Sequence, residues 1–333
     1  MKLTRILSVI VCSFIGVAGA AAQTCADAPA GLISWWTGDG TTDDLLGANN
    51  GTPEGGVGYQ PGLVGDAFSL DGIDDGVSLP DMNDKLPAGT FTYVAWARIA
   101  PGPQQPYSRT ILGSYSNGSD DLLMNAGGRF QLHYAFYDDN HNQTCGVTST
   151  SLFPNVDEWT FVAVTFDGQT IAAYMNDQME VRSCPGGTAT RRIRWIGRAA
   201  ATGRFRGQID EVAVFNRALS GAELNAIYSA DLAGMCKADA IKNIAQQKTT
   251  EVVQQIVDLN LHQGIENSLD AKLSGALAAL DDMNDQNDIA AINSLQAALN
   301  AIEAQRDKKI PSDDADALIA AIREVIDLLS SVI

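Results

Sequence analysis

The sequence predicts a mainly β domain, an antiparallel sandwich, followed by an all-α helical bundle. Short segments rich in Val, Ile, Phe, Trp and Thr recur between Gly, Pro, Asn and Asp without intervening helices up to position 215. After Cys236 the aromatic residues are absent and apolar residues recur at helical spacing. We therefore expect a signal peptide at 1–22, a sandwich domain at 25–236 and a four-helix module at 237–333.

Composition excludes some classes of partner. The chain has 333 residues, a formal net charge of -18 and 45% hydrophobic residues, enough apolar material for two cores. An acidic balance disfavours nucleic acid, because phosphate binding requires clustered Lys and Arg. One basic cluster, at 191–206, is interpreted as solvent-facing strand positions.

The N-terminus has the pattern of a secretory signal peptide. Lys2 and Arg5 precede an apolar run at 6–17 and five small residues at 18–22. The run is too short to cross a bilayer comfortably, and no second apolar segment is long enough. We expect cleavage after Ala22 and a mature protein that is secreted, either extracellular or periplasmic, without a transmembrane segment.

Four cysteines remain after the predicted cleavage, and three pairings of them are possible. An oxidising compartment favours disulfides. We favour Cys25 with Cys236, which bracket the β-rich region, and Cys145 with Cys184, which lie on neighbouring β segments. Zinc is the competing interpretation, but no C-x-x-C pair occurs and the three histidines are scattered.

The predicted strands follow from local pattern. Ten segments have strand character: 32–36, 67–70, 76–79, 91–99, 110–115, 129–136, 159–166, 171–175, 194–196 and 208–215. The last of these alternates apolar and polar residues apart from one slip near its end. Turns at 167–169 and 176–178 predict hairpins, because Asp-Gly supports the positive backbone dihedrals of a tight turn.

A short helix is predicted directly after the last strand. Ser220 and Glu223 have the spacing of a capping box, and Leu224, Ile227 and Tyr228 form the apolar stripe that follows it.

The helical module is predicted from periodicity. The first helix covers 239–259, and amphipathic stripes that begin at Leu269, Ile292 and Leu318 indicate three more, with Ser312 capping the last. Four helices with short loops make a small antiparallel bundle.

Several motifs of the β region occur together in a recognisable order. Gly-Leu-Ile-Ser-Trp-Trp-Thr-Gly-Asp-Gly at 31–40 is followed by the segments 49–52, 61–75, 158–163 and 207–220. In this order they resemble the concanavalin A-like, laminin G-like jelly roll of secreted bacterial proteins. The resemblance implies the fold and says little about the ligand, because such sandwiches carry many functions.

The helical region carries a second resemblance. Segments 259–273, 290–295, 302–310 and 316–320 are similar to the FIMAH module found at the C-termini of secreted bacterial enzymes and surface proteins. Asp307 departs from the family, whose members tend to have Gly there. The resemblance implies no specific ligand, so the module is either a spacer or a recognition element.

Calcium is the cofactor that the sequence suggests. The candidate ligands are Asp39, Asn50, the carbonyl of Gly51, and Asp210, because hard oxygen ligands in loops suit this ion. The jelly-roll resemblance implies a structural calcium between Asp39 and Asp210. The alternative is that Asp39 caps a turn and Asp210 is an ordinary strand residue.

A sugar site is the sharper functional hypothesis, because lectin-like sandwiches bind glycans through aromatic faces and polar side chains. The exposed candidates are Tyr107, Tyr115, His133, Tyr137 and Asp139. Alternation places Leu132, Tyr134 and Phe136 on the core face of the same segment.

The tryptophans divide by position. Trp35 and Trp36 point to opposite faces of a strand, so we expect at most one of them in the core. Trp96 and Trp159 are predicted core residues, and Trp195 is left open.

Catalysis is not expected. A glycosidase needs two carboxylates at a fixed separation, and the sequence shows neither that pattern nor a G-x-S-x-G elbow. We expect a non-catalytic protein that recognises a glycan or glycoprotein. The alternatives are an adhesive or structural component that binds protein or the cell envelope, and a glycoside hydrolase with an unrecognised site.

Overall fold

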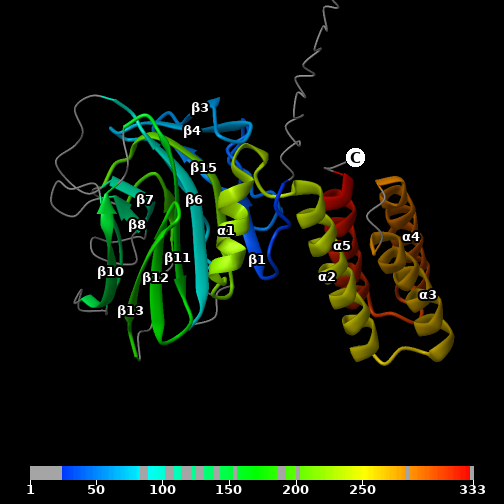
Figure 1. Ribbon diagram of the computed structural model, residues 1–333. Coiled ribbons are helices and arrows are strands. Elements are labelled where there is room, and N and C mark those ends of the chain that lie inside the picture. The colour runs from blue at the N-terminus through cyan, green and yellow to red at the C-terminus, as the bar shows by residue number, and fades with distance from the viewer. Residues whose placement is uncertain are drawn as a thin grey trace, which may run out of the picture.

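The computed structural model shows an antiparallel jelly-roll-like domain followed by five helices (Figure 1). It describes residues 25–82, 89–101, 109–113, 122–124, 131–137, 143–152, 156–185, 193–199, 203–281 and 285–330. The predicted signal peptide at 1–22 lies outside these residues. The predicted fold class, a β sandwich followed by a helical bundle, is confirmed.

An eight-stranded sheet forms one layer, in the order β13-β12-β11-β6-β15-β4-β3, with β1 also pairing with β15. Its strands are β1 (Leu32–Trp36), β3 (Gly58–Pro61), β4 (Asp66–Asp71), β6 (Phe91–Ile99), β11 (Trp159–Phe166), β12 (Thr170–Met175), β13 (Gln178–Ser183) and β15 (Arg206–Phe215). The strands pair antiparallel throughout, as the hairpin turns at 167–169 and 176–178 predicted.

A seven-stranded sheet forms the other layer, in the order β10-β9-β8-β7-β14-β5-β2. Its strands are β2 (Thr52–Glu54), β5 (Gly76–Ser78), β7 (Arg109–Gly113), β8 (Leu122–Met124), β9 (Gln131–Tyr137), β10 (Gln143–Leu152) and β14 (Trp195–Ile196). The sequence pattern did not predict β2, β3, β8 and β10. β10 is rich in Thr, Ser and Gln, so its composition resembles that of a loop.

Two apolar clusters occupy the two faces of the eight-stranded sheet. Trp36 belongs to the core between the sheets, and Trp35 belongs to a second cluster on the outer face. The expectation that at most one of them is in the core is therefore wrong, because both are fully buried. Leu224 and Ile227 of α1 (Gly221–Ala230) cover the outer face (Figure 1).

The slip in the last strand is a β-bulge. The register between β15 and β6 shifts between Asp210 and Ala213, and Glu211 adopts a φ of 52°. Because a bulge inserts one residue, the side-chain parity changes along the strand, so Ile209 and Val212 both face the inner core. The bulge places two consecutive acidic residues, Asp210 and Glu211, in the buried middle of the sheet.

The helices follow the predicted stripes. After α1 comes a 3-10 turn (Asp231–Ala233), then α2 (Lys237–Asp258), α3 (Gln263–Leu280), α4 (Asp285–Gln305) and α5 (Ser312–Ser330). The last four helices surround one apolar core that contains no aromatic side chain. No helix within the described ranges is long and apolar enough to cross a membrane.

Both favoured disulfides are present. Cys25 bonds Cys236 at the start of α2, and a bridge between Ala26 and Met235 lies beside it. Cys145 of β10 bonds Cys184, which follows β13, so this disulfide links the two sheets.

Candidate functional site

An aromatic cleft opens on the outer face of the eight-stranded sheet, beside α1. Its volume is about 450 Å³. It is lined by Trp96 of β6, Trp159 of β11, Asn176 of the turn before β13, Tyr228 and Ser229 of α1, and Asp231. The volume is within the usual range of ligand pockets, and aromatic walls with a few polar groups are typical of them.

Strand register brings the two tryptophans to this face. Arg98 of β6 pairs with Trp159 of β11, and Phe161 pairs with Trp96 two residues along. Because alternate residues of a strand share a face, Trp96, Arg98, Trp159 and Phe161 all lie on the outer side. The ring of Trp96 meets that of Phe161 edge-on, with centroids 5.3 Å apart.

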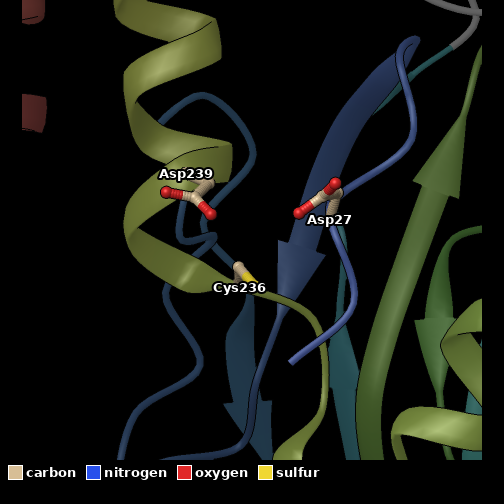
Figure 2. Close-up of side chains that lie close together, drawn as sticks. All are labelled: Asp27, Cys236 and Asp239. Carbon is tan, nitrogen blue, oxygen red and sulfur yellow. The ribbon is translucent and has the colours of Figure 1, made fainter. Parts of the chain in front are cut away.

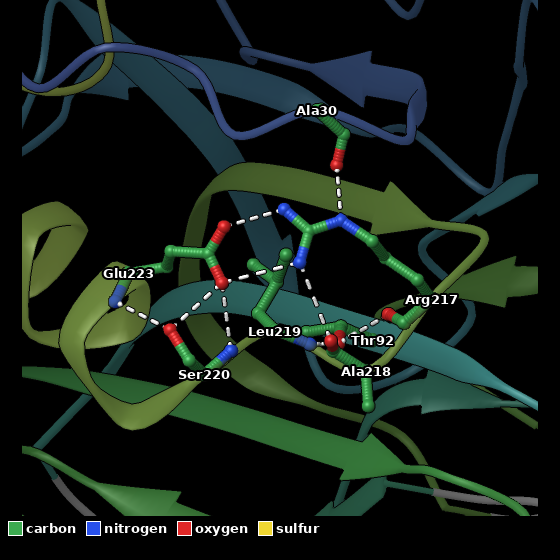
Figure 3. Close-up of polar contacts among 7 residues, drawn as sticks. All are labelled: Ala30, Thr92, Arg217, Ala218, Leu219, Ser220 and Glu223. Atoms are coloured by element: carbon green, nitrogen blue, oxygen red, sulfur yellow. Dashed lines mark hydrogen bonds and ion pairs between the residues drawn. The ribbon is translucent and has the colours of Figure 1, made fainter.

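Helix α1 supplies the opposite wall of the cleft and is anchored at its start. Ser220 and Glu223 form the predicted capping box, and Arg217 holds the Glu223 carboxylate from the strand side (Figure 3). Thr92 of β6 accepts a hydrogen bond from the Leu219 N–H, 2.9 Å, and donates one to the Arg217 carbonyl. The hydrogen bond from Arg217 lowers the pKa of Glu223 to about 2, so the Glu223 carboxylate stays ionised at neutral pH.

Tyr228 extends from this anchored helix over the sheet. Its ring stacks on Trp96 with centroids 5.8 Å apart and an interplanar angle of 27°. The Tyr228 hydroxyl and the Asp231 carboxylate form no hydrogen bond within the part of the chain that the structure describes. Both groups are therefore available to a ligand in the cleft.

Asn176 completes the polar lining. Its Oδ1 accepts the Phe161 N–H at 2.9 Å, which fixes the side chain. Asn176 and Asp231 both have positive φ, 54° and 47°. Such backbone values are uncommon for residues other than Gly, and Asn and Asp tolerate them best. The cleft therefore combines two aromatic walls with polar groups held at defined positions.

Two of the five predicted ligand residues, His133 and Tyr137, belong to β9 of the other sheet. His133 is half-buried on β9, and its Nδ1 lies 2.7 Å from the Thr148 hydroxyl. Burial lowers the pKa of His133, which favours the neutral ring. Tyr137 ends β9, and its side chain lies outside the described residues, as do Tyr107, Tyr115 and Asp139 altogether. These five residues remain predictions.

A cluster of charged residues lies where the sandwich meets the helices. The Asp210 Oδ2 accepts the N–H groups of Leu63 and Val64, at 2.8 and 3.0 Å. Asp39 accepts the Asp66 N–H from the other end of the same turn, at 2.9 Å. The structure thus brings the two predicted acidic ligands, Asp39 and Asp210, to one glycine-containing turn.

Glycine is required in that turn. At Gly62 an added Cβ would collide with Oδ2 of Asp210, and at Gly65 it would collide with Oδ1 of Asp39. Gly65 also has a φ of 69°, which favours Gly. The close approach of the backbone is what lets the turn N–H groups reach both carboxylates.

Glu211 and Lys237 join this cluster, although the sequence did not suggest either. The Trp35 indole N–H donates to Oε2 of Glu211 at 3.1 Å. The Lys237 ammonium donates to Oδ2 of Asp39 and lies 3.7 Å from Oε1 of Glu211. Two carboxylates therefore contact one ammonium, and the Asp210 carboxyl lies close enough to interact with its charge.

Burial dominates the electrostatics of this cluster. It raises the pKa of Asp210 to about 7, against the opposing effect of the Val64 and Leu63 N–H groups. It raises the pKa of Glu211 to about 8, although the Lys237 charge acts in the other direction. Burial also raises the pKa of Asp39, but the Lys237 and Asp66 hydrogen bonds outweigh it, so that pKa falls below its usual value.

The residues present fit a bound cation in part. Oδ1 of Asp210 and Oε1 of Glu211 are buried and have no hydrogen-bond partner among the described residues. Such oxygens are suitable ligands for a hard cation. The predicted ligands Asn50 and Gly51 have other partners, since Asn50 Oδ1 accepts the Asp44 N–H and the Gly51 carbonyl accepts the Thr42 hydroxyl.

Two other clusters of acidic residues are less suited to hold a metal ion than the charged cluster around Asp210. Asp27 and Asp239 lie around Cys236 (Figure 2), but the Cys236 sulfur is already bonded to Cys25 and offers no thiolate. In the second group, Asp75 accepts the Asp71 N–H and Asp71 accepts the Ile73 N–H, so these carboxylates hold a turn.

The cleft was missed by sequence reasoning because its parts are remote in the chain. Trp96 and Trp159 were assigned to the core. Trp96 is 5% exposed, in agreement with that assignment, whereas Trp159 is half-buried at the cleft. Trp195, which was left open, is 8% exposed. The sequence does show a tryptophan in each of two predicted strands and a tyrosine in the helix predicted after the last strand. It does not show that these elements pack together.

Comparison with known proteins agrees with this architecture. Residues 71–225 match the family described as the concanavalin A-like lectin/glucanases superfamily. This match covers the greater part of the sandwich and agrees with its antiparallel jelly-roll-like arrangement. No curated protein sequence matches the chain.

Solved structures with a similar arrangement are distant. Domain 4 of AbnA, a GH43 extracellular arabinanase from Geobacillus stearothermophilus in complex with arabinotriose, is 17% identical with a TM-score of 0.47, over 58% of this chain and 96% of that one. A Trypanosoma rangeli sialidase in complex with sialic acid is 17% identical with a TM-score of 0.43, over 61% of this chain and 33% of that one.

Proposed function

We propose that the jelly roll binds carbohydrate without catalysis, at the aromatic cleft beside α1. The observation that carries this proposal is the combination of the Trp159 and Tyr228 rings with two polar groups, the Tyr228 hydroxyl and the Asp231 carboxylate, that have no hydrogen-bond partner among the described residues. Sugar rings present an apolar face to aromatic side chains and hydroxyls to polar ones, so one such cleft serves both. The match to a superfamily described by lectins and glucanases supports the same class of ligand.

The number of carboxylates supports binding rather than hydrolysis. Glycosidases use two carboxyl groups that flank the scissile bond. Among the described residues, Asp231 is the one carboxylate that lines the aromatic cleft. A hydrolase that also uses the Asp157 carboxylate of the neighbouring polar cleft is the alternative, and a reducing-sugar assay on the bound glycan would reveal it.

A glycan array tests the proposal directly. Wild type should bind a defined set of glycans, and Trp159→Ala should lose that signal because it removes an aromatic wall. Ile73→Ala is the matched control, since Ile73 is 70% exposed and does not line the cleft. A clean array for the folded wild type would overturn the proposal.

A protein-binding role is the second candidate. Met179 and Val181 are 53% and 52% exposed on β13, which pairs within its sheet with β12 alone among the described strands. Exposed apolar residues on an edge strand favour contact with another protein. Retained binding to cells together with a clean glycan array would favour this adhesive role.

We further propose that calcium stabilises the charged cluster, with Asp39, Asp210 and Glu211 as ligands. Two buried oxygens without a hydrogen bond among the described residues support a cation there: Oδ1 of Asp210, and Oε1 of Glu211, which has the Lys237 ammonium at 3.7 Å. Isothermal titration of calcium into chelator-stripped protein should give heat and raise the melting temperature. Asp210→Asn should abolish both effects, and no effect in wild type would reject the calcium proposal.

Export is proposed from the disulfides. Two disulfides in a chain of this size suit an oxidising compartment. N-terminal sequencing of the protein purified from its source should begin directly after Ala22.

A further inference from the structure

A second cleft lies on the same outer face, next to the aromatic one. Its volume is about 280 Å³, and its lining is polar, with Gln60, Ser69, Arg98, Asp157, Arg206 and Gln208 as the side chains that matter here. Two guanidinium groups, two amides, a carboxylate and a hydroxyl make it a surface of hydrogen-bond donors and acceptors. The polar lining of this second cleft differs from the aromatic lining of the first, so together the two offer both hydrogen bonds and aromatic faces to a ligand.

Strand register shows that the two clefts are neighbours. Arg98 of β6 pairs with Trp159 of β11 on one side and with Gln208 of β15 on the other, and Gln208 pairs with Ser69 of β4. These four residues form one row across the sheet. Three strand spacings of about 4.8 Å give the row a length of about 14 Å, which exceeds one sugar ring.

Arg98 is the boundary between the two clefts. Its guanidinium lies 5.3 Å from the Trp159 ring centroid, as in a cation–π contact, and 3.8 Å from the Asp157 carboxylate. It also donates to Oε1 of Gln208. The same guanidinium therefore contacts an aromatic wall of the first cleft and the floor of the second.

The floor of the second cleft is held in place. Gln208 is 5% exposed, and its amide donates to the Pro61 carbonyl at 3.1 Å while its oxygen accepts from Arg98. Arg206 donates to the Pro101 carbonyl at 3.1 Å. Side chains fixed in this way lose little conformational entropy when a ligand binds.

We propose that the two clefts form one groove for an extended oligosaccharide, so that the ligand is a polysaccharide chain rather than a terminal sugar. One ring lies against Trp159 and Tyr228, and the hydroxyls of the following residues lie over Arg98, Arg206 and Ser69. This inference rests on the proposed carbohydrate-binding function and adds the length of the ligand to it.

Chain-length dependence tests the groove. The probes are glucose, xylose and arabinose oligosaccharides of one to six residues, titrated into the full-length protein by calorimetry. For the series that binds, affinity should rise at least about tenfold from the shortest ligand that binds to the six-residue one, because further hydrogen bonds form in the polar cleft. Equal affinity at every length would overturn the groove and leave the proposed function intact.

Single variants distinguish the contribution of the aromatic cleft to binding from that of the polar cleft. Arg206→Ala should weaken the six-residue ligand about tenfold and leave the shortest unchanged, whereas Trp159→Ala should weaken both. Arg204→Ala is the matched control, because Arg204 donates to the Ile73 and Ala199 carbonyls and does not line either cleft. An Arg206→Ala protein that melts like wild type and binds the long ligand equally would contradict the groove. If no oligosaccharide binds wild type, the proposed function and this inference both fail.

Discussion

The jelly roll and the helical bundle bury their side chains in different ways. The sandwich has aromatic clusters on both faces of its larger sheet, a bulged strand and two buried carboxylates with raised pKa values. The bundle has an aliphatic core and, within its described ranges, one buried ion pair, which joins Lys242 to Asp288 at 3.3 Å. Irregular backbone and unpartnered polar atoms commonly mark functional sites, and a regular aliphatic core is sufficient for stability. This contrast supports our proposal that the ligand binds to the sandwich.

The largest effect of a substitution on the free energy of unfolding is expected inside the bundle. Lys242→Met leaves the Asp288 carboxylate, 4% exposed, without its cation. Removing one member of a buried pair costs about 3–5 kcal/mol, which urea denaturation would measure. Lys248→Met is the control, because its exposed pair with Glu324 is worth about 0–1 kcal/mol. Equal losses in the two variants would contradict a stabilising role for the buried pair.

The second-largest loss of stability is expected on removal of the Cys25–Cys236 disulfide at the domain junction. Cys25 and Cys236 are 211 residues apart, and Cys145 and Cys184 are 39 apart. Replacing the first pair by Ser should cost about 2–5 kcal/mol, and replacing the second pair should cost less, because a longer loop restricts the unfolded chain more. Thermal denaturation of both double variants compares them. The reverse order would show that local packing, rather than loop length, decides their contributions.

Stability of the metal-free sandwich should fall as pH rises. Asp210 and Glu211 have folded-state pKa values of about 7 and 8, above their ordinary values of 3.8 and 4.5. The folded state therefore keeps protons that the unfolded state releases, so their contribution is complete below about pH 4 and is lost as pH rises through 7 and 8. The slope is at most about 1.4 kcal/mol per pH unit for each group.

Urea denaturation in chelator between pH 5 and pH 8 measures this slope. The double variant Asp210→Asn with Glu211→Gln should flatten it, because neither replacement titrates. A wild type whose stability rises over this range would contradict the direction of the two pKa shifts.

The smallest effect of a substitution on stability is expected at the start of α1. Ser220→Ala removes the capping side chain and should cost about 1 kcal/mol. Because α1 carries Tyr228, glycan affinity should fall slightly as well. Thr250→Ala is the control, since its hydroxyl bonds the Gln246 carbonyl on an exposed helix face. A melting temperature that drops equally in both variants would show that the cap contributes nothing of its own.

Local pattern was sufficient for much of the fold. β1, β6 and β11 coincide with the predicted segments, and the capping box correctly placed α1 after the last strand. It failed at β10, whose polar residues lack a strand signature. The burial of Trp35 was also missed, because it depends on helices that pack over the outer face.

Candidate sites were harder to predict than the fold. The sequence suggested Asp39 and Asp210 together because each occurs in a recognisable motif, and their side chains do bind one turn; their role as metal ligands stays a prediction. Glu211 was not found, because its burial depends on the bulge. The aromatic cleft depends on strand register and on the placement of α1, so Trp159 and Tyr228 meet only in three dimensions.

Calorimetry on Trp159→Ala and His133→Ala tests the central claim most directly, because these residues lie on different sheets. The ligand is the glycan that binds wild type most tightly on the array. Carbohydrate binding at the cleft beside α1 predicts that Trp159→Ala raises Kd at least about tenfold and that His133→Ala leaves it unchanged. Loss of binding in His133→Ala with full affinity in Trp159→Ala would contradict the account and place the ligand on the seven-stranded sheet.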